Sequence, residues 1–381
     1  MFKVGYATGS RAEYGIVRRY LIELNKNENI DLGLLVTGTH LEEAFGNTID
    51  EIKYDGIKID CTIPININTS NNAYVLNSMS ICLRDFGKHF NENKYDLLII
   101  LGDRYEMLSV AIAAAMNNIP ILHLHGGEIT LGNYDEFIRH SLTKMSKYHF
   151  TSTEDYRRRV IQLGENPNRV YYVGALGAEN AIKNISENSK YKDEYKYMVI
   201  LFHPETLTNV DESDQISTLL DSLGEFKDEY KLKFIGNNAD TNSGIIKKKI
   251  LDFCENNKCQ YIVNLVNDEF HNLLHNATCF IGNSSSGIIE APSLGTYTVN
   301  IGDRQKGRIR GNSVIDVKCE KESIIQGIYE AIDMKNKNIK INNPYYKEKC
   351  LSSYVELTLN ILNNIDNEPK EFFDADFDIK Y

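Results

Sequence analysis

The chain has 381 residues, of which 42% are hydrophobic and 25% are charged, and its formal net charge is −11. This composition excludes a mainly disordered chain, a coiled coil and a collagen-like fibre, and the length favours two domains. The acidic balance argues against general binding to nucleic acid or to an anionic membrane, although local arginines and helix N-termini can still hold a small anionic ligand.

The N-terminal residues and the cysteines indicate a cytoplasmic protein. The start, MFKVGYATGS, lacks the charged and apolar regions of a signal peptide. No apolar run approaches the roughly 18 residues that span a bilayer. The seven cysteines are scattered without a Cys-x-x-Cys pair, which is typical of reduced thiols.

Short apolar runs alternate with amphipathic stretches along the first half of the chain. Strands are predicted at 2–8, 32–37, 97–101, 121–124, 149–152 and 170–173, and helices at 14–25, 107–117, 138–145 and 154–163. We assign no element between residues 38 and 96. The alternation predicts a Rossmann-type sheet.

A second series of strands and helices follows segment 178–196, which is polar and is predicted to be a linker or an exposed connection. Strands are predicted at 197–202, 232–235, 260–263, 279–282 and 297–301, and helices at 213–226, 245–255, 269–275, 321–334 and 345–364. The acidic tail 367–381 has interleaved aromatics, and whether it docks stays open. The pattern predicts two α/β sheets that meet at a cleft.

Ligands of open α/β sheets bind beyond the carboxyl ends of the strands, so the residues that follow each strand are the candidates. In TGSRAEYG (8–15), Arg11 can pair with an anion at a helix start, or it is a surface arginine after an ordinary turn. In Gly102-Asp103-Arg104, which follows the apolar run LLIIL, Asp103 is either an acid–base group with a tuned pKa or a helix cap.

The densest cluster of ionisable groups lies at HLHGGE (123–128) and at Asp135, Glu136, Arg139 and His140. The two glycines let the backbone approach a ligand closely. Either of the two histidines can be a core group. No third ligand has a recognised metal spacing, and we expect no metal.

Candidates in the second half also follow strands. His203, in FHPE, either points into the cleft or is a core histidine. The stretch GNSSSGIIEA (282–291) brings small hydroxyl groups and free backbone N–H groups to a helix start, which suits phosphate oxygens. Glu290 lies about one turn into this helix, where a carboxylate can bind a ribose diol, and Arg304 adds a cation after the next strand.

Taken together, these motifs resemble those of the hydrolysing UDP-N-acetylglucosamine 2-epimerases. The resemblance covers residues 1 to about 360 and is carried, in order, by TGSRAEYG (8–15), LGDRYE (101–106), HLHGGE (123–128), DEFIRHSLTKMS (135–146), FHPET (202–206), NSSSGIIEAP (283–292) and NIGDRQKGR (300–308).

The resemblance implies a glycosyltransferase-B-like fold with Rossmann-like domains at 1–177 and 178–344. Segment 345–381 would supply a closing helix that crosses back to the first domain, and an acidic tail. The implied ligand is the small nucleotide sugar UDP-N-acetylglucosamine, with no cofactor, no metal and no nucleic-acid or membrane partner. The implied assembly is a homodimer or homotetramer.

The implied reaction converts UDP-N-acetylglucosamine and water to N-acetylmannosamine and UDP through 2-acetamidoglucal. Loss of the C2 proton and of UDP, followed by hydration, requires acid and base groups near C1 and C2 and cations near the diphosphate. The resemblance puts Asp103, Asp135 and His203 at catalytic positions, and Glu128 is a further candidate. It puts nucleotide or substrate binding at Arg11, Ala12, Arg104, Asn238, Ser284, Ser285, Gly287, Glu290 and Arg304.

One departure from the family pattern concerns the residue before the two glycines. Some relatives carry a glutamate there, whereas this chain has His125. Whether Glu128, His125 or Glu136 takes that role stays open at this point.

Other activities fit the same motifs. The substrate can be a UDP-linked diacetamido-trideoxy sugar or a GDP-linked sugar, and a non-hydrolysing epimerase would retain UDP on the product. A non-catalytic sugar-nucleotide sensor is disfavoured, because it has no use for three carboxylates around the sugar.

Overall fold

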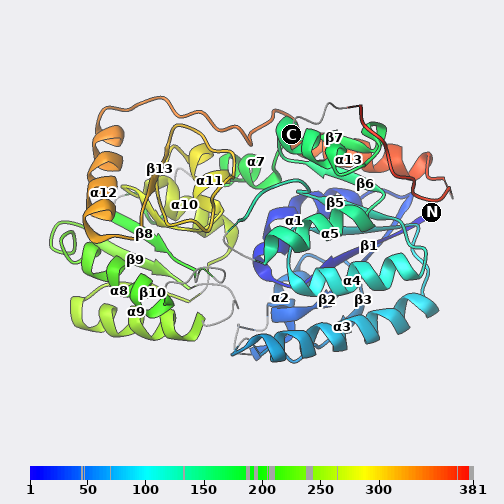
Figure 1. Cartoon of the computed structure of the whole chain (residues 1–381), viewed down its shortest axis with the longest axis horizontal. Helices are drawn as coiled ribbons and strands as arrows, with labels where there is room; N and C mark the ends of the chain where they lie inside the picture. Colours follow the sequence, from blue (N-terminus) through cyan, green and yellow to red (C-terminus); the bar gives the residue numbers. More distant parts are fainter. Residues whose placement is uncertain are drawn as a thin grey trace.

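The structure is a computed structural model that describes the chain except for residues 44, 45, 47, 69, 132, 133, 186–188, 193–195, 204, 206–210, 237–242, 264, 367 and 377–381. Strands and helices alternate along the chain and form two sheets of parallel strands, which lie side by side (Figure 1). This confirms the predicted α/β fold class.

The first sheet has seven strands in the order β3-β2-β1-β4-β5-β6-β7. Its elements are β1 (Phe2–Thr8), α1 (Arg11–Asn25), β2 (Ile30–Thr37), α2 (Ile49–Tyr54), β3 (Ile59–Ile63), α3 (Asn72–Glu92), β4 (Leu97–Leu101), α4 (Tyr105–Met116), β5 (Ile121–Leu124), α5 (Asp135–Met145), β6 (Tyr148–Thr151), α6 (Glu154–Gln162) and β7 (Val170–Tyr172). The stretch 38–96 therefore holds α2, β3 and α3, which periodicity left unassigned.

The second sheet has six strands in the order β10-β9-β8-β11-β12-β13. Its elements are α7 (Leu176–Lys183), β8 (Tyr197–Leu201), α8 (Glu212–Leu223), β9 (Lys231–Ile235), α9 (Ser243–Asn257), β10 (Gln260–Ile262), α10 (Asn267–Asn276), β11 (Phe280–Gly282), α11 (Ser286–Ile289), β12 (Thr298–Ile301), β13 (Val314–Val317) and α12 (Lys321–Asn336), before the last helix, α13 (Cys350–Asn363). Strand β13 was not predicted.

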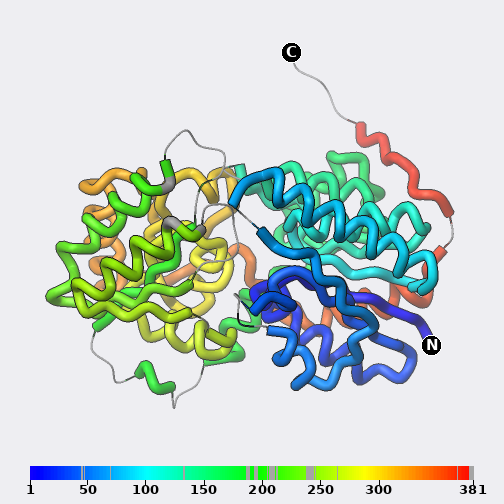
Figure 2. The backbone as a smooth tube through the Cα atoms, turned by 90° about the horizontal axis from the view of Figure 1, so that it is seen from below, coloured from blue at the N-terminus to red at the C-terminus, as the bar shows by residue number. Residues whose placement is uncertain are grey.

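Each sheet is buried on both faces, which is why its strands are near-continuous apolar runs such as LLIIL in β4. In the first half, α1, α2 and α13 pack on one face and α3, α4 and α5 on the other. In the second half, α8, α9 and α12 cover one face and α7 and α10 the other. Figure 2 shows the two layered halves side by side.

The prediction of a linker at 178–196 is wrong for its first residues. Helix α7 continues to Lys183, and Ala178, Asn180 and Ala181 are buried. The Asn180 side chain donates to the Ile16 carbonyl of α1 at 2.8 Å. The polar composition therefore reflects a helix with one buried face, held by contacts that the local sequence does not reveal.

The last helix returns to the first sheet, where Tyr354 packs against Tyr20 and Phe150. Beyond it, the described part of the acidic tail docks on the first half. The Lys370 ammonium group contacts the Glu165 carboxylate and the Ser146 carbonyl at 2.6 Å each. The Asp366 carboxylate pairs with Lys147 and Arg169.

No helix in the described part of the chain is both long enough and apolar enough to cross a membrane.

Candidate active site

A cavity of about 320 Å³ lies between the two halves. Most of its lining residues follow β1, β4 and β5 in the first half and β8, β11 and β12 in the second. In each sheet the strand order reverses at this point, between β1 and β4 and between β8 and β11. Open α/β sheets bind ligands at such switch points, and the volume suits a small molecule.

The cavity is lined by most of the residues that the sequence predicted for the site. These are Arg11, Ala12, Asp103, Arg104, Glu128, Asp135, His203, Ser284, Ser285, Glu290 and Arg304. Gly287 does not line it. A Cβ at that position would lie 2.6 Å from the Thr298 side chain, so Gly287 permits close packing of α11 on β12. Asn238 falls outside the described residues.

Asp103 lies at the end of β4 and forms an ion pair with Arg139 of α5. The N-cap position of α4 is Arg104, and its side chain makes no capping hydrogen bond. The structure therefore does not support the helix-cap interpretation of Asp103. Arg139 is buried, and burial together with the nearby Arg308 lowers the pKa of its guanidinium group.

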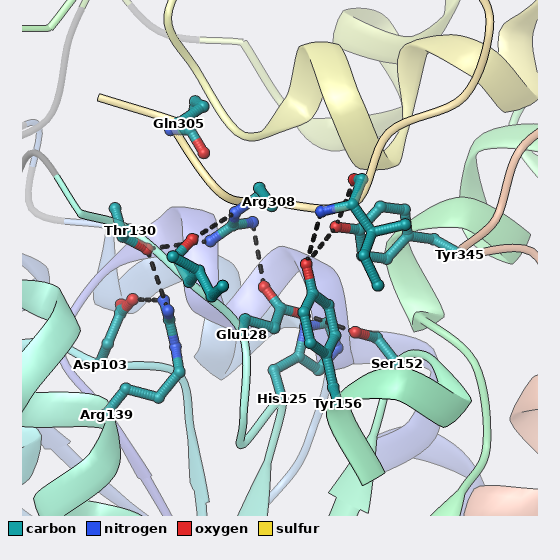
Figure 3. Close-up of polar contacts among 12 residues, drawn as sticks. Asp103, His125, Glu128, Thr130, Arg139, Ser152, Tyr156, Gln305, Arg308 and Tyr345 are labelled. Carbon is teal, nitrogen blue, oxygen red and sulfur yellow. Dashed lines mark hydrogen bonds and ion pairs between the residues drawn. The ribbon is translucent and has the colours of Figure 1, made fainter. Parts of the chain in front are cut away.

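A polar network connects Asp103 to the second half of the chain (Figure 3). Arg139 Nη1 donates to Thr130 Oγ1 at 2.9 Å, and Arg308 Nη2 donates to the same oxygen at 3.3 Å. Arg308 Nη1 lies 3.0 Å from Glu128 Oε2. Arg308 belongs to the loop after β12, which also bears Arg304. Its guanidinium group therefore connects this loop to the loop that bears Glu128.

Glu128 is held by three partners. Besides Arg308, its Oε1 accepts a hydrogen bond from Ser152 Oγ at 2.7 Å and lies 3.1 Å from His125 Nδ1. Burial alone would raise the pKa of Glu128, but Arg308, His125 and Ser152 lower it to about 2. The carboxylate is therefore charged and anchored.

His123, two residues earlier, is a core histidine. Its Nε2 lies 2.8 Å from the Gly102 carbonyl and its Nδ1 lies 3.2 Å from Thr143 Oγ1. Burial lowers the pKa of His123 to about 3, which keeps the ring neutral. The two histidines therefore have different environments, because His125 lies beyond the end of β5 at a φ of +65°.

The turn after β1 is fixed by hydrogen bonds like those of a capping box, except that the Glu13 carboxylate bonds to the N–H of Gly9, one residue before the N-cap Ser10. Ser10 Oγ accepts from the Glu13 backbone N–H, and Glu13 Oε2 accepts from Gly9 N at 3.1 Å and from Ser10 Oγ at 3.2 Å. Burial and the nearby Glu106 raise the pKa of Glu13, against the pull of Arg104. The Ser-x-x-Glu spacing is a signal from which this contact could have been predicted.

The second half supplies the opposite wall, where Asn283 organises three strand ends. Its side chain accepts from His203 N at 2.8 Å and donates to the His203 carbonyl at 2.9 Å. Its own carbonyl accepts from Arg304 Nη1 at 3.1 Å and from Gln305 Nε2 at 3.0 Å. Glu290 lies between α11 and the following 3₁₀ turn rather than within a longer helix, with His271 Nε2 3.6 Å away.

Sequence reasoning placed Arg139 in the ionisable cluster without giving it a role, and it did not single out Arg308. Both lie inside motifs that carry the family resemblance, in DEFIRHSLTKMS and NIGDRQKGR. The sequence shows an arginine in each motif. Which carboxylate each arginine pairs with depends on the packing of α5 and on how the two halves are arranged.

We expect His203→Ala to lower UDP affinity or turnover by about tenfold or more, the value of one hydrogen bond to a charged group. His203 is buried and lines the cavity, and the Asn283 contacts use only its backbone, so the fold should survive. Calorimetric titration with UDP, steady-state rates and the melting temperature test this. Unchanged affinity and turnover would make His203 a core group.

Comparison with known proteins agrees with this geometry. The sequence profile of the family described as UDP-N-acetylglucosamine 2-epimerase matches residues 22–357. The chain belongs to the UDP-N-acetylglucosamine 2-epimerase family. This confirms the family that the motifs predicted.

Two curated relatives cover nearly the whole chain. The Escherichia coli polysialic acid biosynthesis protein P7 is 48% identical over 382 residues, which span 98% of each chain. The UDP-N,N'-diacetylbacillosamine 2-epimerase (hydrolyzing) of Legionella pneumophila is 36% identical over 376 residues, which span 95% of this chain and 98% of that one.

The fold of the epimerase family is also found by structure comparison. The Methanocaldococcus jannaschii UDP-GlcNAc 2-epimerase, solved in complex with UDP-GlcNAc and UDP, matches with a TM-score of 0.80 over 94% of this chain and 99% of that one. At 19% identity this likeness shows the fold alone. It confirms the predicted glycosyltransferase-B-like arrangement of two Rossmann-like domains.

Proposed function

We propose that this epimerase-family enzyme is hydrolysing and converts UDP-N-acetylglucosamine and water to N-acetylmannosamine and UDP. One observation carries the proposal: a single cavity has acid–base groups on its first-half wall and Arg304 with the serine-rich turn on its second-half wall. A sugar attached to a diphosphate requires both sets of groups within one site.

The second-half wall is proposed to bind the nucleotide. Arg304 and the turn at Ser284 and Ser285 would neutralise the diphosphate, with Arg11 from the first half. Glu290 would bind the ribose diol, and Asn238 is proposed as a further nucleotide-binding residue. Gly287 would act indirectly, because its close packing on β12 holds the serine-rich turn in place.

The first-half wall is proposed to act on the sugar. Asp103 and Asp135 lie at the end of β4 and at the start of α5, and both line the cavity. Proton transfer at C2 and addition of water at C1 require groups on more than one side of the ring. Arg104, whose Nε donates to the buried Glu106 carboxylate at 2.5 Å, adds a fixed cation to this wall.

A second candidate substrate is a UDP-linked diacetamido-trideoxy sugar. It is favoured by the 36% identity to a relative named as a hydrolysing UDP-N,N'-diacetylbacillosamine 2-epimerase. We rank UDP-N-acetylglucosamine first because the relative with 48% identity is named for polysialic acid biosynthesis. The domain limits at 177 and 344 and a homodimeric or homotetrameric state remain predictions.

Incubation with each nucleotide sugar in D2O, followed by NMR of the products, tests the proposal. We expect UDP-N-acetylglucosamine to give free UDP and N-acetylmannosamine with deuterium at C2. Release of UDP-N-acetylmannosamine without free UDP would identify a non-hydrolysing enzyme. Turnover of only the diacetamido sugar would select the second candidate, and binding without turnover of any sugar would identify a sensor.

We expect EDTA to leave turnover unchanged. The cavity can neutralise a diphosphate with arginines and backbone N–H groups. Within the described ranges, no group of three or more histidine, cysteine, aspartate or glutamate side chains is arranged to hold a metal ion. Rates measured before and after chelation and dialysis test this. A loss of activity that one added divalent cation restores would contradict it.

A further inference from the structure

The backbone at His125 has a conformation that is uncommon outside glycine. His125 follows β5 with a φ of +65°, in the left-handed region that only a few per cent of non-glycine residues occupy, histidine more often than most. Its backbone N–H donates to the Phe150 carbonyl of β6 at 2.8 Å, which holds this conformation. A fixed and unfavourable backbone conformation is typical of residues whose side chain must be placed accurately.

The contact with Glu128 defines the state of the His125 ring. Glu128 is ionised, so it can only accept, and His125 Nδ1 at 3.1 Å therefore carries a proton. In the neutral ring Nε2 then has the free electron pair. Nε2 is buried and has no hydrogen-bond partner in the part of the chain that the structure describes, although His125 lines the cavity.

Glu128 itself is poorly suited to proton transfer. Both of its oxygens are used, Oε1 by Ser152 and His125 and Oε2 by Arg308, and the residue is 2% exposed. A carboxylate that orients a histidine and stabilises its protonated form is a familiar arrangement in catalysis. Glu128 therefore fits an anchoring role better than the direct role expected from the sequence.

We propose that His125 is a catalytic base of this enzyme and that Glu128 is its positioning residue. The inference rests on the proposed function. Nε2 takes the proton from C2 of the sugar, the C2–H electron pair forms the C1=C2 double bond, and the C1–O pair leaves with UDP. The resulting imidazolium is stabilised by the Glu128 carboxylate and returns its proton to solvent after the products leave.

Rescue of a His125→Gly variant by imidazole tests this role. Glycine adopts a φ of +65° without strain and leaves a space shaped for an imidazole ring. We expect turnover to fall by about 10²–10⁴-fold, the range for one acid–base group. Added imidazole should restore part of the rate with saturation, while UDP affinity stays near that of the wild type.

The matched control is His125→Asn, which also tolerates positive φ but fills the space with an amide. It should lose a similar factor in turnover, keep its UDP affinity and gain nothing from imidazole. Asp103→Asn should likewise gain nothing from imidazole.

Two results would overturn the proposal. One is turnover within a few-fold of wild type in the asparagine variant with unchanged UDP affinity, a test that stands even if the glycine variant does not fold. The other is a folded, UDP-binding glycine variant that imidazole does not rescue. Failure of the wild-type enzyme to act on any nucleotide sugar would instead contradict the proposed function.

Discussion

Asp103→Asn is expected to lower turnover by about 10²–10⁴-fold, the usual range for loss of one acid–base group. Asparagine keeps the shape of the side chain, and its amide oxygen can still accept from Arg139, but it cannot take a proton from the sugar or from water. Asp103 is placed rigidly, because the buried strand β4 precedes it and the Arg139 ion pair orients it.

UDP affinity should change little in this variant, since the proposed diphosphate contacts come from Arg304, Arg11 and the serine-rich turn. Steady-state rates, calorimetric titration with UDP and the melting temperature separate the possible roles. Near-normal turnover with an unchanged melting temperature would remove Asp103 from the proton-transfer groups. An equal loss of turnover and UDP affinity would show that its main role is to hold Arg139 and the site around it.

Arg304→Met is expected to weaken UDP binding by about 10- to 150-fold, because hydrogen bonds to a charged group contribute about 1.5–3 kcal/mol. Arg304 is buried at the cavity wall, and its Nε has no hydrogen-bond partner within the described residues. A buried guanidinium with an unused donor fits an anionic ligand.

The fold should tolerate this change, because the Asn283 carbonyl keeps its hydrogen bond from Gln305 when Arg304 is removed. The matched control is Lys306→Met, two residues along the same loop. Lys306 is exposed and pairs with Asp303 at 3.3 Å, so its removal should leave UDP affinity unchanged. Equal affinities of the two variants would contradict a diphosphate contact by Arg304.

The sequence alone determined most of the strand–helix series and the positions of most strand ends. The apolar run at 97–101 predicts β4 with its observed bounds, and most other predicted strands differ from the observed ones by one or two residues. Burial on both faces of a parallel sheet requires continuous apolar runs, so these strands are visible locally. Because ligands bind at the carboxyl ends of such strands, Asp103, His203 and Ser284 could be predicted to line one cavity.

Only the tertiary structure decided which charged groups meet. Glu128 and Arg308 belong to different halves, and nothing near either residue indicates the other. Their ion pair anchors the Glu128 carboxylate, and His125 lies on the other side of it, within 3.1 Å of Glu128 Oε1. The pKa of a buried group depends on its burial and on its charged neighbours. Both are set by the packing of α5 and of the two halves, and not by the order of residues along the chain.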